Sequence, residues 1–150
     1  MLNFFDLTGR VALVTGASSG IGAATARVLA DLGARVAIGY HRNEAGAEEV
    51  ERDIVQRDGK AIRVRADARV ATDIRELVNV STSELGPIDI LINNAGSLIE
   101  RMRLVEQTEE RWDEVMNLNL KSAMLCSQAV APSMIERKTG AIVNVASIAG

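Results

Sequence analysis

The chain contains 150 residues with a formal net charge of -3, and 47% of its residues are hydrophobic and 25% charged. This composition and length predict one globular domain with a substantial core. The slightly acidic net charge does not indicate nucleic-acid binding. A single cysteine and a single histidine cannot form a zinc site, and one cysteine cannot form an internal disulfide. No signal peptide and no long apolar run is present, so we expect a cytoplasmic protein that does not span a membrane.

Apolar residues follow two different periods along the chain. Short apolar runs bounded by turn residues predict buried strands, and amphipathic stretches between them predict helices. In chain order we expect strand 11–14, helix 21–32, strand 35–38, helix 44–57, strand 61–66 (alternating, hence near the sheet edge), helix 72–85 and strand 88–92.

The last third of the chain predicts a loop, a long helix and a fifth strand. The segment 97–107 has no clear period and is expected to be a loop. Thr108 is expected to cap a helix that ends near Lys138, in which Pro132 predicts a kink or a local break. A further apolar run predicts a strand over 141–145.

Five alternations of strand and helix predict parallel strands joined by right-handed crossovers. We therefore expect an α/β fold, a doubly wound parallel sheet of the Rossmann type with helices on both faces. The expected strand order is 3-2-1-4-5. Residues 1–150 are interpreted as one dinucleotide-binding domain.

A glycine-rich loop follows the first predicted strand and reads Thr15-Gly16-Ala17-Ser18-Ser19-Gly20-Ile21-Gly22. Glycines at a strand-to-helix turn let the backbone approach a pyrophosphate, and the helix N-terminus offers unpaired N–H groups to it. The position of the loop on the first strand of an α/β chain favours dinucleotide binding over a tight turn without a ligand.

The same loop satisfies a second pattern, the G-x-S-x-G elbow of serine hydrolases, through Gly16, Ser18 and Gly20. A hydrolase of that type needs a serine, then an aspartate or glutamate, then a histidine in chain order, and its elbow does not require a glycine at position 22. The single histidine, His41, lies just after the second predicted strand. The hydrolase is therefore the less favoured alternative.

Together these motifs resemble the short-chain dehydrogenase/reductase family. The glycine loop matches the family's T-G-x-x-x-G-I-G motif, and 93–96 matches its N-N-A-G motif. Asp67 matches an acidic residue that contacts adenine in relatives, and Asn119 and Ser147 match the active-site asparagine and serine. The resemblance implies cofactor binding by Thr15, Gly16, Ser18, Ser19, Gly20, Ile21, Gly22, Asp67, Ala68, Asn94, Ala95 and Gly96, and catalytic roles for Asn119 and Ser147.

The resemblance also implies a reaction. Hydride would pass between a nicotinamide cofactor and a carbonyl or alcohol carbon of a small-molecule substrate, such as a 3-oxoacyl compound or another small ketone. The family uses a tyrosine as general acid/base, in a Y-x-x-x-K motif about a dozen residues after the serine. The sequence ends at Gly150 and its one tyrosine, Tyr40, lies near the second strand. We therefore expect a catalytically incomplete fragment without the C-terminal strands.

Two further expectations concern partners and alternatives. Family members usually form dimers or tetramers through long helices, so the resemblance implies a homo-oligomer when the protein has its full length, with the 108–138 helix contributing one face. A non-catalytic dinucleotide-binding or assembly module remains the alternative to a reductase. Asn93 and Asn94 are interpreted chiefly as ties between neighbouring strands and loops.

The residues after the second predicted strand favour NADP(H) over NAD(H). Folds that bind NAD often place an acid about 20 residues past the glycines, where it binds the ribose 2′-hydroxyl. The segment 39–43 contains no acid, and the first one is Glu44. His41 and Arg42 are expected to meet a 2′-phosphate, because arginine donates in a fork to phosphate oxygens. A solvated loop is the alternative for both side chains.

Overall fold

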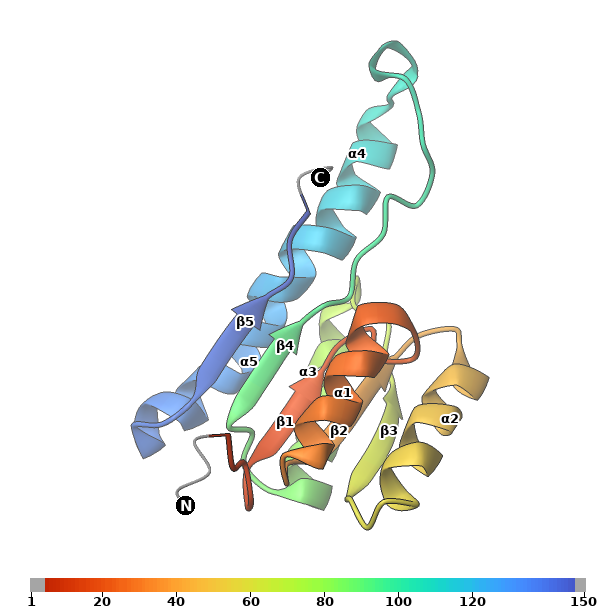
Figure 1. Ribbon diagram of the computed structural model, residues 1–150. Coiled ribbons are helices and arrows are strands. Elements are labelled where there is room, and N and C mark those ends of the chain that lie inside the picture. The colour runs from red at the N-terminus through yellow and green to blue at the C-terminus, as the bar shows by residue number, and fades with distance from the viewer. Residues whose placement is uncertain (1–4, 148–150) are drawn as a thin grey trace.

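The structure is a computed structural model that describes residues 5–147. Its centre is a sheet of five parallel strands in the order β3-β2-β1-β4-β5 (Figure 1), which confirms the predicted strand order. The alternating segment 61–66 forms the edge strand β3, as predicted. The strands are β1 (Val11–Val14), β2 (Arg35–Tyr40), β3 (Ala61–Arg65), β4 (Ile90–Asn93) and β5 (Ala141–Asn144).

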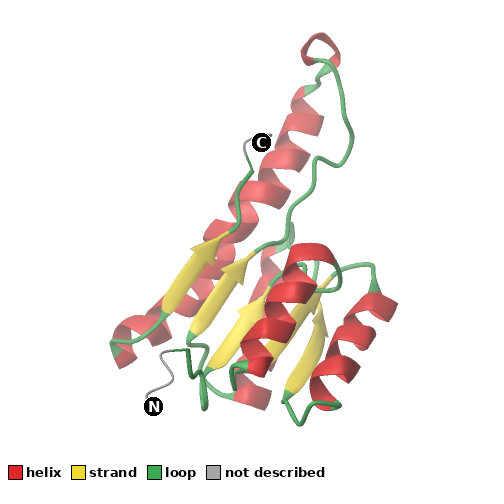
Figure 2. Ribbon diagram, in the orientation of Figure 1, coloured by secondary structure: helices red, strands yellow, loops and turns green. Residues whose placement is uncertain are grey.

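Helices cover both faces of this sheet (Figure 2). Ala12 and Val14 of β1 belong to the core under α1 and α2, whereas Val11 and Leu13 belong to the core under α3 and α5. All four residues of β1 are fully buried, which explains the continuous apolar run in the sequence. The helices are α1 (Gly20–Asp31), α2 (Glu44–Val55), α3 (Ala71–Leu85) and α5 (Ser122–Arg137).

The long helix expected after Thr108 consists of three segments. The first, α4 (Glu109–Met116), begins at Thr108, whose hydroxyl accepts a hydrogen bond from the backbone nitrogen of Arg111 at 3.2 Å. A π-helical segment, η2 (Asn117–Lys121), then joins α4 to α5. In Figure 1, α4 and the loop before it extend beyond the carboxyl ends of the strands.

The departures from the expected helix and loop are local. The helix α5 runs through Pro132 without the break that the proline could have caused, and the long helix is interrupted instead at η2. The loop expected over 97–107 contains one short 3-10 turn, η1 (Leu104–Glu106). Among the described residues, no helix combines the length and the apolar character needed to cross a bilayer.

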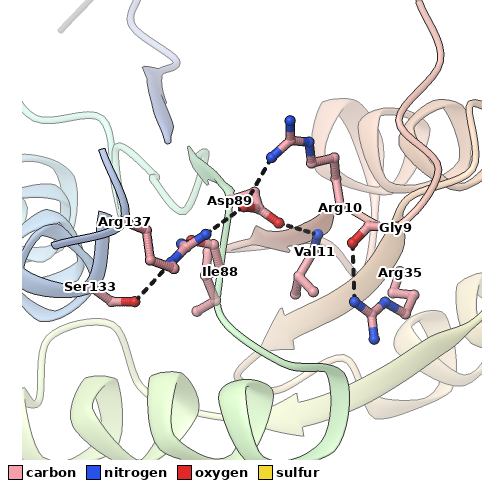
Figure 3. A network of polar contacts seen from close by, with 8 residues as sticks. All are labelled: Gly9, Arg10, Val11, Arg35, Ile88, Asp89, Ser133 and Arg137. Carbon is pink, nitrogen blue, oxygen red and sulfur yellow. Dashed lines mark hydrogen bonds and ion pairs between the residues drawn. The ribbon is translucent and has the colours of Figure 1, made fainter. Parts of the chain in front are cut away.

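A buried carboxylate ties three parts of the fold together at the amino ends of the strands (Figure 3). The side chain of Asp89, which is 11% exposed, accepts hydrogen bonds from the backbone nitrogen of Val11 at 3.0 Å and from Arg137 at 2.7 Å. Arg10 lies at 3.5 Å from the same carboxylate, and Arg137 also donates to the carbonyl oxygen of Ile88 at 2.6 Å. The network therefore joins β1, the segment before β4 and the last turn of α5.

The groups around Asp89 favour the ionised form of its side chain. Burial alone would raise the pKa of the carboxyl, but the hydrogen bonds from Arg137 and Val11 and the charges of the two arginines outweigh it. The pKa of Asp89 consequently lies below its usual value. Sequence patterns gave no sign of this network, because its members are far apart in the chain.

The strand β5 forms the outer edge of the sheet and pairs only with β4 among the described residues. All four of its residues are exposed, and Ile142 and Val143 expose 39% and 48% of their surfaces. The predicted fifth strand is confirmed. Its outer edge presents backbone groups that have no strand partner within residues 5–147.

Candidate functional site

The loops that follow β1 and β4 meet at the carboxyl end of the sheet, where open α/β folds bind their ligands. The side chain of Asn94 donates to the carbonyl oxygens of Thr15 and Gly16 at 3.0 and 3.1 Å. In return, the Thr15 hydroxyl accepts hydrogen bonds from the backbone nitrogens of Asn94 and Ala95, both at 3.0 Å. The glycine loop and the N-N-A-G motif are therefore one unit, and Asn94 acts as the tie that the sequence predicted.

Two glycines shape this unit. A Cβ atom at Gly22 would overlap the carbonyl oxygen of Gly16 and lie 2.5 Å from Nδ2 of Asn94, so α1 approaches the loop only because the residue is glycine. At Gly20 the φ angle is +54°, a conformation that favours glycine, and a Cβ built there has no atom within 4 Å. The space in front of α1 is thus open.

The N-terminus of α1 fits a pyrophosphate. Ser19 occupies the N-cap position but makes no side-chain hydrogen bond to the helix, so its hydroxyl does not cover the first-turn N–H groups. Ile21 exposes 65% of its surface at the same point, so its side chain does not cover the helix N-terminus. An open cradle with unpaired N–H groups and a positive helix end matches a dinucleotide.

An open groove of ≈ 490 Å³ runs between α1 and α2 beside the glycine loop. Asn43 lines this groove, and its side chain donates to the carbonyl oxygen of Ser18 at 3.1 Å. The same side chain accepts a hydrogen bond from the backbone nitrogen of Gly46 at 3.1 Å and so caps α2. Asn43 was not among the predicted site residues, although an asparagine directly before a helix is a typical N-cap.

The ends of β2 and β3 bring His41 and Asp67 together. These strands pair in parallel, and Nε2 of His41 lies 3.5 Å from Oδ2 of Asp67. Ala68 follows Asp67 and is half-buried. Arg42 is exposed and forms no ion pair within residues 5–147, so its guanidinium remains available to an anion.

Asp67 is held chiefly by Arg69. The Nη2 atom of Arg69 lies 2.6 Å from Oδ2 of Asp67, and its Nε lies 2.9 Å from Oδ1. The hydrogen bonds from Arg69, together with the charge of His41, lower the pKa of Asp67 to about 2 against the opposing effect of burial. Within the described part of the chain, no three histidine, cysteine, aspartate or glutamate side chains cluster as metal ligands.

Asn119 lies in the π-helical segment η2 and holds the loop that follows the N-N-A-G motif. Its side chain donates to the carbonyl oxygens of Ser97 and Val115, both at 2.8 Å, and accepts from the backbone nitrogen of Ser97 at 3.0 Å. π-helical turns inside α-helices occur frequently at functional sites. The amide of Asn119 is thus engaged with the backbone, which makes it a positioning group in this structure.

Ser147 lies shortly after β5 and is exposed. β5 is anchored to β4 by Asn93, whose Nδ2 donates to Oδ1 of Asn144 at 2.9 Å and to the hydroxyl of Ser127 at 3.2 Å. Asn93 therefore ties β4, β5 and α5 together, as the sequence predicted. The strand pairing directs Ser147 toward the same end of the sheet as the N-N-A-G loop.

Comparisons with known proteins agree with this geometry. A family model described as short chain dehydrogenase matches residues 10–150. A 3-oxoacyl-[acyl-carrier-protein] reductase of Synechocystis sp. is 40% identical over 148 residues, covering 96% of this chain and 58% of the relative. A metagenomic short-chain oxidoreductase in complex with NADP shares 40% identity, with a TM-score of 0.89 and coverage of 95% and 64% of the two chains. A short-chain type dehydrogenase/reductase from Mycobacterium marinum shares 34% identity, with a TM-score of 0.92 and coverage of 99% and 60%.

The dinucleotide-type loop on a doubly wound sheet defines a nucleotide-binding α/β protein. The chain belongs to the short-chain dehydrogenase family. It spans about three-fifths of the length of the Synechocystis relative.

Proposed function

We propose that the protein is an NADP(H)-dependent oxidoreductase that exchanges hydride with a carbonyl or alcohol carbon of a small molecule. The main observation behind this proposal is the glycine loop. Thr15 and Asn94 fix it to the loop after β4, and it opens onto the uncovered N-terminus of α1. Membership of the short-chain dehydrogenase family and the NADP-bound metagenomic relative support the proposal. When bound, the nicotinamide supplies or accepts the hydride.

The proposed roles of the side chains follow from their places. The first-turn N–H groups of α1 and the backbone of the glycine loop would hold the pyrophosphate, and Asp67 and Ala68 would lie at the adenosine end. Ala95 and Gly96, next to the tie made by Asn94, would line the cofactor on the β4 side. Ser147 would donate a hydrogen bond to the substrate oxygen, on which negative charge builds up during reduction.

The preference for NADP(H) is proposed from Arg42. Its exposed guanidinium has no carboxylate partner among residues 5–147, and no acid stands between β2 and α2 to bind a ribose 2′-hydroxyl. An arginine fork on a phosphate is a charge-assisted contact, so its removal should weaken NADPH binding by about tenfold or more. NADH, which lacks the 2′-phosphate, should be affected little.

Fluorescence titration of the purified full-length protein with NADPH and NADH tests this preference. The variants are Arg42→Ala and, as a matched control, Arg52→Ala, since Arg52 is an exposed arginine of α2. The wild type and the control should prefer NADPH, and Arg42→Ala should lose most of the preference. Tighter binding of NADH than of NADPH by the wild type would refute NADP(H) as the cofactor.

We propose a 3-oxoacyl thioester or another small ketone as the substrate, because the Synechocystis relative is named for the reduction of a 3-oxoacyl group. Oxidation of NADPH by the full-length protein should be measured with a 3-oxoacyl thioester and with small ketones. Reduction that falls strongly in Ser147→Ala is expected. Dinucleotide binding without turnover on any carbonyl would favour the alternative, a non-catalytic dinucleotide-binding module.

We propose that the full-length protein is a homo-oligomer, a dimer or tetramer, located in the cytoplasm. Large apolar side chains lie exposed along the long helix: Trp112 at 56%, Leu120 at 61% and Met124 at 51%. Exposed apolar patches of this kind are typical of association surfaces. Light scattering on the eluted protein tests the association, and a monomer at micromolar concentration would contradict it.

A further inference from the structure

The loop after the N-N-A-G motif contains a strained turn at Ile99. The φ angle of Ile99 is +60°, which lies in the left-handed region. The backbone nitrogen of Glu100 donates to the carbonyl oxygen of Leu98 at 2.6 Å and so closes a three-residue γ-turn. A γ-turn with a positive central φ is rare and strained, and a β-branched side chain makes that conformation still less favourable. Such strain persists only where the surrounding contacts enforce it.

Contacts on both sides of the turn enforce this conformation. Before the turn, Oγ of Ser97 accepts a hydrogen bond from the backbone nitrogen of Ile99 at 2.9 Å. The Asn119 side chain binds the backbone nitrogen and the carbonyl oxygen of Ser97, at 3.0 and 2.8 Å. After the turn, Glu100 forms an ion pair with Arg111 of α4. The loop is thus fastened to η2 at one end of the turn and to α4 at the other (Figure 1).

We call residues 97–100 the strap. Burial does not hold the strap in place, because every residue from 97 to 106 is exposed. Ile99 exposes 38% of its surface, so its side chain gains little from the strained position. Polar contacts at the surface are weak restraints, and segments without buried apolar contacts open at low free energy. The strap can therefore open while the core stays packed.

The strap lies beside the candidate site and occupies the side chain of Asn119. It follows directly on Gly96, where a Cβ atom would lie 2.7 Å from Oδ1 of Asn119. In the closed strap, the amide of Asn119 donates to the carbonyl oxygens of Ser97 and Val115 and accepts from the backbone nitrogen of Ser97. Opening removes both contacts with Ser97. One N–H and the carbonyl oxygen of the amide then become available beside the N-N-A-G loop.

We propose that the strap is a switch that holds or frees the amide of Asn119, and that the strain at Ile99 keeps the closed strap poised to open. The strain offsets part of the free energy of the fastening contacts, so a residue that is unstrained at position 99 should hold the strap closed. The inference goes beyond the proposed function, because it concerns a motion of the chain that needs neither cofactor nor substrate.

The test compares Ile99→Gly with Ile99→Ala in the purified full-length protein. Both variants remove the exposed side chain, but only glycine adopts a φ of +60° without strain. Hydrogen exchange is measured by NMR at the backbone N–H of Ser97 and at the side-chain amide of Asn119. Both groups should exchange about fivefold more slowly in Ile99→Gly than in Ile99→Ala. A loop that was merely flexible would exchange faster with glycine, which gives the opposite sign.

A second pair of variants tests the fastening after the turn. Glu100→Gln removes the carboxylate that pairs with Arg111, and exchange at Ser97 and Asn119 should accelerate by about twofold, as expected for an exposed ion pair. Glu114→Gln is the matched control, because Glu114 is an equally exposed partner of Arg111 that lies within α4 and does not touch the strap. It should not accelerate exchange at either group.

Three results would overturn the proposal. The first is exchange at Ser97 that is equal or faster in Ile99→Gly than in Ile99→Ala, because the turn would then store no strain. The second is a response at Ser97 that the side-chain amide of Asn119 does not share, because the strap would then not control that amide. The third is unchanged exchange in Glu100→Gln. Each of these results leaves dinucleotide binding, and with it the proposed function, untouched.

Discussion

Thr15 and Asn94 bind each other reciprocally, each through its backbone and its side chain. The Thr15 hydroxyl accepts from the backbone nitrogen of Asn94 at 3.0 Å, and the carbonyl oxygen of Thr15 accepts from the Asn94 side chain, also at 3.0 Å. Thr15 is 5% exposed, so these bonds are shielded from water. The pair fixes the glycine loop against β4, and the proposed cofactor site depends on that alignment.

Replacement of Thr15 by valine should destabilise the fold. Thr15→Val keeps the shape of the side chain but leaves the backbone N–H groups of Asn94 and Ala95 without their acceptor. A buried donor without a partner costs about 1–3 kcal/mol, which urea unfolding would detect. Thr15→Ser, which keeps the hydroxyl, is the control and should lose less. Equal urea midpoints for Thr15→Val and the wild type would contradict the role of the pair.

Replacement of Gly22 by alanine should weaken both folding and dinucleotide binding. The added methyl group would overlap the Gly16 carbonyl oxygen and crowd Asn94, which pushes α1 away from the loop. Overpacking of this kind typically costs about 1–3 kcal/mol. Chemical unfolding and NADPH titration measure the two effects. Val28→Ala, at a position of α1 that is 55% exposed, should change neither, and wild-type affinity in Gly22→Ala would refute the close approach.

Asp89 should make stability depend on pH in the acid range. Its pKa in the folded state lies below the usual value, so its contribution is complete above the unfolded-state pKa of about 3.9. The contribution is then lost as the pH falls past that value toward the lower folded-state pKa. Asp89→Asn should therefore be less stable than the wild type at pH 7 by about 2 kcal/mol, and the gap should narrow at pH 3.

Unfolding by urea at the two pH values measures this gap. Asp113→Asn serves as the control, because Asp113 is exposed on α4 and its replacement should change stability little at either pH. A gap between the wild type and Asp89→Asn that stays constant from pH 7 to pH 3 would show that the ionised carboxylate does not hold Arg137 and Val11.

Asn119 should control the mobility of the loop that it holds. In Asn119→Ala the backbone amide of Ser97 loses its acceptor, and its hydrogen exchange should accelerate by about tenfold, as expected for a hydrogen bond of about 1 kcal/mol. Asn119→Asp should not restore protection at neutral pH, because its carboxylate would face the carbonyl oxygens of Ser97 and Val115. Asn117→Ala, in the same π segment, is the control, and wild-type protection in Asn119→Asp would contradict the donor role of the amide.

Most of the fold could be predicted from periodicity. The apolar run of β1 and the alternating run of β3 placed these strands at the centre and at the edge of the sheet, because burial on one or both faces leaves a pattern in the sequence. The π segment around Asn119 could not be predicted in this way. A shift of hydrogen bonding by one residue hardly alters the helical period, so the sequence indicated one long helix and a disturbance at Pro132 instead.

The candidate site, like the fold, has one part that the sequence could predict and one part that it could not. The glycine loop and Asn94 were predictable because their motifs are contiguous and each residue type has a local reason. The grip of Arg69 on Asp67 and the link from Asn43 to Ser18 were not predicted. Both depend on the direction in which a polar side chain turns after a strand, and neither composition nor period encodes that direction.

The network around Asp89 lies at the opposite end of the strands from the glycine loop. A substitution there would leave every dinucleotide contact intact and still raise the unfolded fraction of the molecule. In a cell such a variant would be degraded faster, so its effect would appear as a lower protein level with normal activity per molecule. Genetic screens that score activity alone would then mistake Asp89 and Arg137 for members of the active site, and only a parallel measurement of protein abundance would separate the two groups.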